Sequence, residues 1–213
     1  MLQKPDVLKV DIEGVILPKH PEKDSPSALR IAFIIKQIEK YRQQNKLKPL
    51  SQYQPPTDFL WDRFQMELGW VIDRLCPNPF SLFQQVVFKK NQEINELMPV
   101  AKDIIKRSVN YYLELVKERN IKYEPNPGII ELLMKIKNEL KIPFRVLSGN
   151  PKLVAEDKLR RVGILDLFLE DNQLPDLSIY GEDILTRGSA IDTIHYQLSQ
   201  SLNSPKHLYL ADR

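Results

Sequence analysis

The feature that most constrains the fold of this chain is the alternation of short apolar segments with amphipathic helical patterns. Apolar segments at 7–10, 142–147 and 207–211 are each followed by polar or acidic residues, as expected of buried strands that end in a turn. Elsewhere, apolar residues recur at the i, i+3, i+4 and i+7 spacing of a helix face. Strands that alternate with helices form parallel sheets. We therefore predict an α/β fold with a parallel sheet.

A block of predicted helices separates the first strand from the second. Proline-rich linkers at 18–26 and 125–128 mark its two ends. We expect this block to form an all-helical cap over residues 18–123, inserted into an α/β core made of residues 1–17 and 124–213. The glycines agree with this division, because only Gly69 of the seven lies inside the block.

The periodicity also places individual elements. In the cap, helices are expected at 27–45, 57–75 and 81–97, and Pro99 should open another. The first of these should bury the face Ile31, Ile34, Ile35 and Ile38. In the core, we expect helices at 129–140, 152–162 and 189–202, and short strands at 167–169 and 177–180. The helix at 129–140 should bury Ile129, Leu132, Leu133, Ile136 and Leu140.

Composition excludes several classes of protein. The formal charge of the 213 residues is 31 − 28 = +3, too small to imply nucleic-acid binding. A mean hydropathy of −0.36 leaves no segment of about 20 apolar residues for a membrane span. The single cysteine, Cys76, excludes an intramolecular disulfide and a zinc site of paired thiolates. No secretory signal begins the sequence, so we expect a cytoplasmic protein that binds neither nucleic acid nor membrane, of open oligomeric state.

Polar residues follow three of the predicted strands. Asp11 and Glu13 come after the first, Ser148 and Gly149 after the second, and Asp212 after the last. Ligands of parallel α/β sheets bind at the carboxyl ends of the strands, so these residues should share one site. Carboxylates suit Mg²⁺, and a hydroxyl beside a turn into a helix suits a phosphate. Two plainer roles stay open: the acids as solvated turn residues, and Ser148 as a helix N-cap.

The order of these motifs resembles the haloacid-dehalogenase-like phosphohydrolase superfamily with a helical cap. The resemblance spans nearly the whole chain and rests on Asp11-Ile12-Glu13-Gly14-Val15, a helical insertion, Leu147-Ser148-Gly149-Asn150, Arg187 and Tyr209-Leu210-Ala211-Asp212. It implies a Rossmann-like core and Mg²⁺-dependent hydrolysis of a small phosphorylated metabolite.

The resemblance also implies a role for each matched residue. Asp11 would be the nucleophile that forms an aspartyl-phosphate and also a magnesium ligand. Glu13 would act as general acid and base, with its backbone carbonyl on the metal. Ser148 and Gly149 would hold phosphoryl oxygens. Two further residues complete the set: Arg187 as the cation that neutralises the phosphate, and Asp212 as a metal ligand.

Three departures from the family pattern keep alternatives open. Glu13 stands where an aspartate is usual, Val15 replaces a threonine, and Arg187 replaces a lysine. The sequence also stops one residue after Asp212, so we expect the C-terminal end of the core to be truncated. The alternatives are a catalytically silent binding protein of the same fold and an enzyme similar to the enolase-phosphatases, whose first motif also reads Asp-Ile-Glu-Gly.

Overall fold

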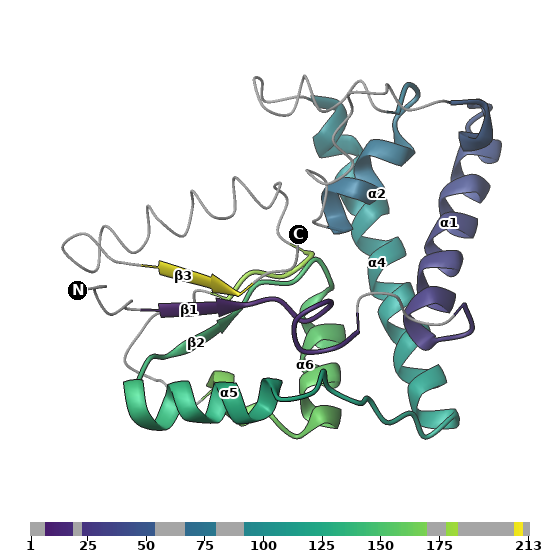
Figure 1. Cartoon of the computed structure of the whole chain (residues 1–213). Coiled ribbons are helices and arrows are strands. Elements are labelled where there is room, and N and C mark those ends of the chain that lie inside the picture. Colours follow the sequence, from purple (N-terminus) through teal and green to yellow (C-terminus); the bar gives the residue numbers. More distant parts are fainter. Residues whose placement is uncertain are drawn as a thin grey trace.

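The structure is a computed structural model that describes residues 7–18, 23–53, 67–79, 92–169, 178–182 and 207–210. Its sheet has three parallel strands in the order β2-β1-β3: β1 (Val7–Val10), β2 (Phe144–Val146) and β3 (His207–Leu210) (Figure 1). Val10 lies opposite both Val146 and Leu210, so the carboxyl ends of the strands are level. The expected parallel sheet is confirmed.

Helices α1 (Pro26–Gln44), α2 (Glu67–Leu75) and α4 (Gln92–Glu118) lie between β1 and β2 in the sequence. They stand together beside the sheet (Figure 1), and a short 3-10 helix, η1 (Leu50–Gln52), follows α1. Apolar side chains from the three helices form one buried cluster that includes Ile34, Ile38, Leu68, Val71, Ile105 and Val109. An α/β core with a helical insertion after its first strand is confirmed, and it is the architecture that the family resemblance implies.

Helix α1 turns two arginines inward. Ser25 caps its N-terminus, because the Ser25 hydroxyl accepts a hydrogen bond from the Ala28 N–H at 3.2 Å. Its buried face repeats every four residues: Pro26, Arg30, Ile34, Ile38 and Arg42. The expected face is therefore wrong at Ile31 and Ile35, which are 37% and 41% exposed. Arg30 and Arg42 have buried hydrogen-bond acceptors, and satisfying these rotates the helix away from the purely apolar stripe.

Helix α4 continues through a proline. The sequence predicts a break before Pro99, whereas the structure shows one helix over Gln92–Glu118 with Pro99 inside it. Proline removes one backbone hydrogen bond and disfavours a helix interior. Burial of Leu97, Ala101 and Ile104 in the cap cluster offsets this cost, so packing on both sides of Pro99 holds the helix together.

The core helices surround a second buried cluster. They are α5 (Ile129–Lys135), the π-helix η3 (Ile136–Leu140), α6 (Lys152–Val162) and α7 (Asp166–Leu169). The cluster includes Leu8, Val10, Ile129, Leu133, Phe144, Val146, Leu159 and Phe168. Of the face expected over 129–140, Ile129 and Leu133 are buried as predicted. Leu132 in α5 and Leu140 in the π-helix are exposed, contrary to expectation.

Two of the expected core strands differ in the structure. Residues 167–169 belong to helix α7 and not to a strand. The strand expected at 177–180 is reduced, in its described part, to one parallel bridge between Leu147 and Ile179. The strands at 7–10 and 207–210 and the helix at 152–162 are confirmed, and the helix expected at 189–202 lies outside the described residues.

Helices α4 and α6 join the cap to the core. Val154 of α6 is a member of the cap cluster. The Tyr112 hydroxyl of α4 lies 3.3 Å from the Asp157 carboxylate of α6 and 2.8 Å from the Tyr123 hydroxyl. Burial, together with the neighbouring Tyr123 and Asp157, raises the pKa of Tyr112, so it stays a neutral donor to Asp157. This contact fixes the cap against one edge of the core.

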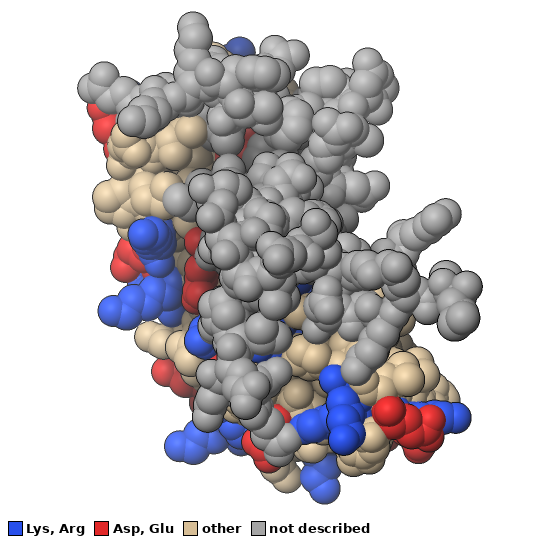
Figure 2. All heavy atoms as spheres, turned by 90° about the vertical axis from the view of Figure 1, so that its left-hand side faces the viewer, with Lys and Arg blue, Asp and Glu red and all other residues tan. Residues whose placement is uncertain are grey.

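Charges of both signs are interspersed on the surface. On the face shown in Figure 2, Lys and Arg side chains lie among Asp and Glu side chains. On α4, for example, Arg107 pairs with Asp103 at 2.8 Å. No helix within the described ranges is long and apolar enough to cross a membrane.

Lys9 is a buried charged residue in the middle of the sheet. It is completely buried in the central strand beside Arg145 of β2, and within the described part of the chain its Nζ makes no hydrogen bond. Burial, reinforced by Arg145, lowers the pKa of Lys9 from 10.5 to about 7. The unfolded chain therefore binds more protons than the folded one between these two values.

Stability should consequently rise with pH between 7 and 10.5. We predict that Lys9→Met stabilises the fold by about 1–3 kcal/mol at neutral pH and removes this rise. Urea unfolding at several pH values measures both effects. A variant that is less stable than wild type at pH 7 contradicts the prediction.

Candidate functional site

The strand ends meet where the sequence places the site. The Asp11 N–H donates to the Leu210 carbonyl of β3 at 2.9 Å, and the Leu147 N–H donates to the Val10 carbonyl of β1 at 3.0 Å. The side chain of Asp11 is 1% exposed, and its Oδ1 accepts the Ile12 N–H at 2.9 Å. Asp11 is therefore a buried, oriented carboxylate at the carboxyl edge of the sheet and not a solvated turn residue.

A tight loop after β1 carries Glu13. Gly14 has φ = 83°, a left-handed conformation that favours glycine, and its N–H donates to the Leu17 carbonyl at 2.7 Å. The loop is held from outside by Asn126 of the return linker, whose Nδ2 donates to the Val15 carbonyl at 2.9 Å and whose N–H donates to the Ile16 carbonyl at 2.8 Å. Asn126 thus ties the linker that returns from the cap to the loop that carries Glu13.

Both carboxylate oxygens of Glu13 are engaged. Oε1 pairs with the Lys158 ammonium of α6, and Oε2 accepts the Asn150 Nδ2 at 2.8 Å. Burial alone would raise the pKa of Glu13, but the Lys158 charge and these hydrogen bonds outweigh it and hold the pKa below its ordinary value of 4.5. Glu13 is therefore ionised at neutral pH.

Asn150 also connects Glu13 to Ser148. Ser148 is fully buried, and its Oγ accepts the Asn150 N–H at 3.1 Å and the Asn150 Nδ2 at 3.2 Å. The plainer interpretation of Ser148 as a helix cap is wrong, because α6 starts after Pro151 without a side-chain capping bond. Ser148 instead fixes the turn that presents Gly149 and Asn150.

A cavity of about 810 Å³ opens between this turn and the cap. Glu13, Gly149, Asn150 and Lys158 line it from the core. Its other walls are the start of α1 and the linker after α4, and they include Ser25, Ser27, Arg30, Arg119, Lys122 and Tyr123. The Glu13 side chain is 30% exposed and the Lys158 side chain 3%, so Glu13 presents more surface to this cavity than Lys158 does.

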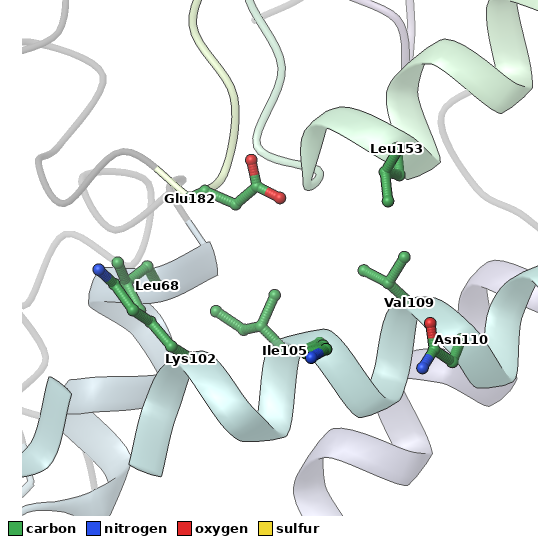
Figure 3. Close-up of a pocket in the computed structure, with 8 residues that line it drawn as sticks. Leu68, Lys102, Ile105, Val109, Asn110, Leu153 and Glu182 are labelled. Atoms are coloured by element: carbon green, nitrogen blue, oxygen red, sulfur yellow. The ribbon is translucent and has the colours of Figure 1, made fainter. Parts of the chain in front are cut away.

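A smaller cavity of about 310 Å³ lies elsewhere on the boundary between cap and core. Figure 3 shows Ile105 and Val109 of α4 across from Leu153 of α6 and Glu182. None of the site residues predicted from the sequence lines it, whereas Glu13 and Gly149 line the larger cavity. We therefore assign the candidate site to the larger cavity.

Sequence reasoning missed Lys158 and gave Asn150 no role. The signal for Lys158 is its position, because α6 buries Val154, Ala155, Lys158 and Leu159 on one face and a lysine there needs a buried partner. Periodicity shows that a partner is required, but only the folded chain shows that it is Glu13, 145 residues away.

Two of the predicted site residues cannot be placed. Arg187 and Asp212 lie outside the described residues, and their assigned roles stay predictions. Among the described residues, no group of three His, Cys, Asp or Glu side chains is arranged to hold a metal ion. The structure thus brings Asp11, Glu13, Ser148 and Gly149 to one edge of the sheet and adds Asn150 and Lys158.

Comparison with known proteins finds similarity to solved structures. No family model and no curated protein matches the sequence. The chain is similar to the solved structure of a "putative beta-phosphoglucomutase" from Thermotoga maritima, with 16% identity and a TM-score of 0.33 over 83% of this chain and 62% of that one. It is also similar to a hydrolase from Pseudomonas syringae, with 12% identity and a TM-score of 0.44 over 99% and 76%. This chain thus spans less than two thirds of the length of the first.

The pairing of Glu13 with Lys158 predicts that substitutions of the two residues have non-additive effects on stability. Lys158→Met leaves the Glu13 carboxylate without its cation and should lower the free energy of unfolding by about 1–3 kcal/mol. The double variant with Glu13→Gln removes both charges and should recover most of that loss. Urea denaturation of the four proteins of this cycle gives the coupling, and simple additivity of the two changes would refute the pairing.

Proposed function

We propose that this chain is a phosphohydrolase that acts on a small phosphorylated metabolite with Mg²⁺, through an aspartyl-phosphate on Asp11. The observation that supports it is the convergence at one sheet edge of an oriented carboxylate, Asp11, with a second carboxylate, Glu13, that faces a cavity. Lys158 and the turn at Ser148 supply the positive charge and hydrogen-bonding groups that a phosphoryl group requires.

The donors present at this edge fit a magnesium ion in part. Asp11 offers a carboxylate and Glu13 a backbone carbonyl, the hard oxygen ligands that Mg²⁺ prefers. The Glu13 carboxylate is engaged by Lys158 and Asn150, so we assign the Glu13 backbone carbonyl, and not its carboxylate, as a magnesium ligand. Asp212 would be the third ligand, as the family resemblance implies. When bound, the ion would neutralise charge on the phosphoryl oxygens.

The chain's own residues account for the chemical steps. The Asp11 carboxylate attacks phosphorus, and the bond from phosphorus to the ester oxygen breaks with its electron pair on that oxygen. Glu13, after taking a proton from water, gives it to this oxygen to release the alcohol. Glu13 then accepts a proton from the water that attacks the aspartyl-phosphate, which frees phosphate and restores Asp11. Glu13 can take up this proton only when its carboxylate is released from the ion pair with Lys158. An incoming phosphoryl dianion favours that release because it competes for the Lys158 ammonium.

The proposal predicts loss of turnover when Asp11 is changed. Asp11→Asn keeps the size of the side chain and removes the nucleophile, so release of phosphate from a panel of monoesters with Mg²⁺ should fall by at least about 1,000-fold. Asp103→Asn, at a carboxylate that is 60% exposed on α4, is the matched control and should keep activity. Equal activity of Asp11→Asn and wild type would refute the proposed mechanism.

Lys158 is expected to bind the phosphoryl group together with Arg187. Lys158→Met should weaken competitive inhibition by inorganic phosphate by about tenfold or more, as expected for loss of a charged hydrogen bond, and Lys158→Arg should restore part of it. Lys152→Met removes a lysine that is 47% exposed on the same helix and should leave inhibition unchanged. An inhibition constant that does not respond to Lys158→Met excludes this role.

A second candidate function is binding without turnover. The burial of Asp11 and the engagement of both Glu13 oxygens favour it, because neither group stands ready for chemistry. A protein of this kind should release no phosphate from any monoester and should show no magnesium affinity in the millimolar range. Turnover that depends on Asp11 rules it out.

A further inference from the structure

Arg30 of the cap is fixed by three helices. Its guanidinium makes a two-pronged ion pair with the Glu67 carboxylate of α2, with Nη1 to Oε1 at 2.6 Å and Nη2 to Oε2. Nη1 also donates to the Ser108 hydroxyl of α4 at 3.3 Å. Arg30 is 2% exposed, so it has little freedom to move relative to the cap.

The same guanidinium reaches the core. Its Nη2 lies 3.5 Å from the Asn150 Oδ1, while the Asn150 Nδ2 donates to Glu13 and to Ser148. A guanidinium only donates hydrogen bonds, so it selects the oxygen end of the amide and directs the nitrogen end toward Glu13. The flipped amide would place its oxygen against the Glu13 carboxylate, which is repulsive.

A second route from α2 reaches the backbone of Asn150. The Leu68 N–H donates to the Gly181 carbonyl at 2.8 Å, and the Gly181 N–H donates to the Asn150 carbonyl at 2.7 Å. Gly181 packs so closely that a Cβ there would lie 2.0 Å from the Gly149 carbonyl oxygen. Two adjacent residues of α2 therefore position Asn150 by independent routes. Glu67 acts on its side chain through Arg30, and Leu68 acts on its backbone through Gly181.

We propose that Arg30 is a positioning residue, through which the cap orients the Asn150 amide and thereby the Glu13 carboxylate. The proposal rests on the proposed function in one respect, that Glu13 transfers protons. It makes the placement of the cap a condition for the placement of a reacting group, so a displaced cap leaves Glu13 without its Asn150 donor.

The test removes Arg30 together with its partner. Arg30→Met with Glu67→Met removes both charges of the pair, so neither is left without the other. Its kcat for a phosphate monoester should fall by about 100-fold, as expected for a misplaced reacting group, with little change in KM. The matched control is Arg42→Met, because Arg42 is a buried arginine on the same face of α1. Its guanidinium donates only to backbone carbonyls among the described residues, those of Lys48, Arg74, Cys76 and Pro77. This control variant should lower the melting temperature and leave kcat unchanged.

A second variant needs no change in the cap. Asn150→Asp still accepts a hydrogen bond from Arg30 but no longer donates to Glu13, so kcat should fall by a similar factor at nearly constant KM. A kcat within twofold of wild type in Asn150→Asp, or in the folded double variant, overturns the proposal.

A readout apart from activity separates this inference from the proposed function. The side-chain NH₂ of Asn150 can be followed by NMR and identified by its absence in Asn150→Asp. Its exchange with water should become at least about tenfold faster when Arg30 and Glu67 are replaced, and not in Arg42→Met. This result in a protein that hydrolyses no monoester refutes the proposed function and supports the positioning role. Equal exchange in wild type and the double variant overturns the role whatever the activity.

Discussion

The engagement of Glu13 by Lys158 and Asn150 is the interaction on which the rest of the candidate site depends. It connects the loop after β1 to α6 and to the turn after β2, and Asn150 continues the contact to Arg30 and Glu67 in the cap. A chain of charged and polar groups thus runs from the core into the helical insertion. A buried ion pair adds little net stability, because the cost of desolvation offsets its attraction, so we infer that this network acts mainly by fixing the position of Glu13.

The fold explains why these groups meet. Parallel pairing of β1 with β2 and β3 brings the three strand ends level, and the buried contacts between α4 and α6 set the cap beside them. Asn126 then holds the loop that carries Glu13. An 810 Å³ cavity is left between core and cap, with polar side chains on both of its walls. Chemistry that needs positioning and charge neutralisation more than strong acids or bases suits such a place.

The sequence predicts the architecture better than the site. Period-2 and period-3.6 patterns place β1, β3, α6 and the helical insertion correctly, because local burial determines them. The pattern fails where a tertiary contact outweighs it: Arg30 turns α1 away from Ile31 and Ile35, and cap packing carries α4 through Pro99. The positions of Asp11, Glu13, Ser148 and Gly149 at the sheet edge follow from their places after strands, and their roles stay predictions. Lys158 and Asn150 gain their roles from contacts across more than a hundred residues, which no local pattern contains.

The central claim is that the carboxyl edge of this sheet transfers a phosphoryl group through Asp11. The most direct measurement is to quench the protein in acid during incubation with Mg²⁺ and a phosphate monoester and to locate any phosphorylated residue by mass spectrometry. The account predicts a phosphoryl group on Asp11 in wild type and none in Asp11→Asn. Hydrolysis that proceeds with no phosphorylated Asp11, or with the phosphoryl group on another residue, would contradict it.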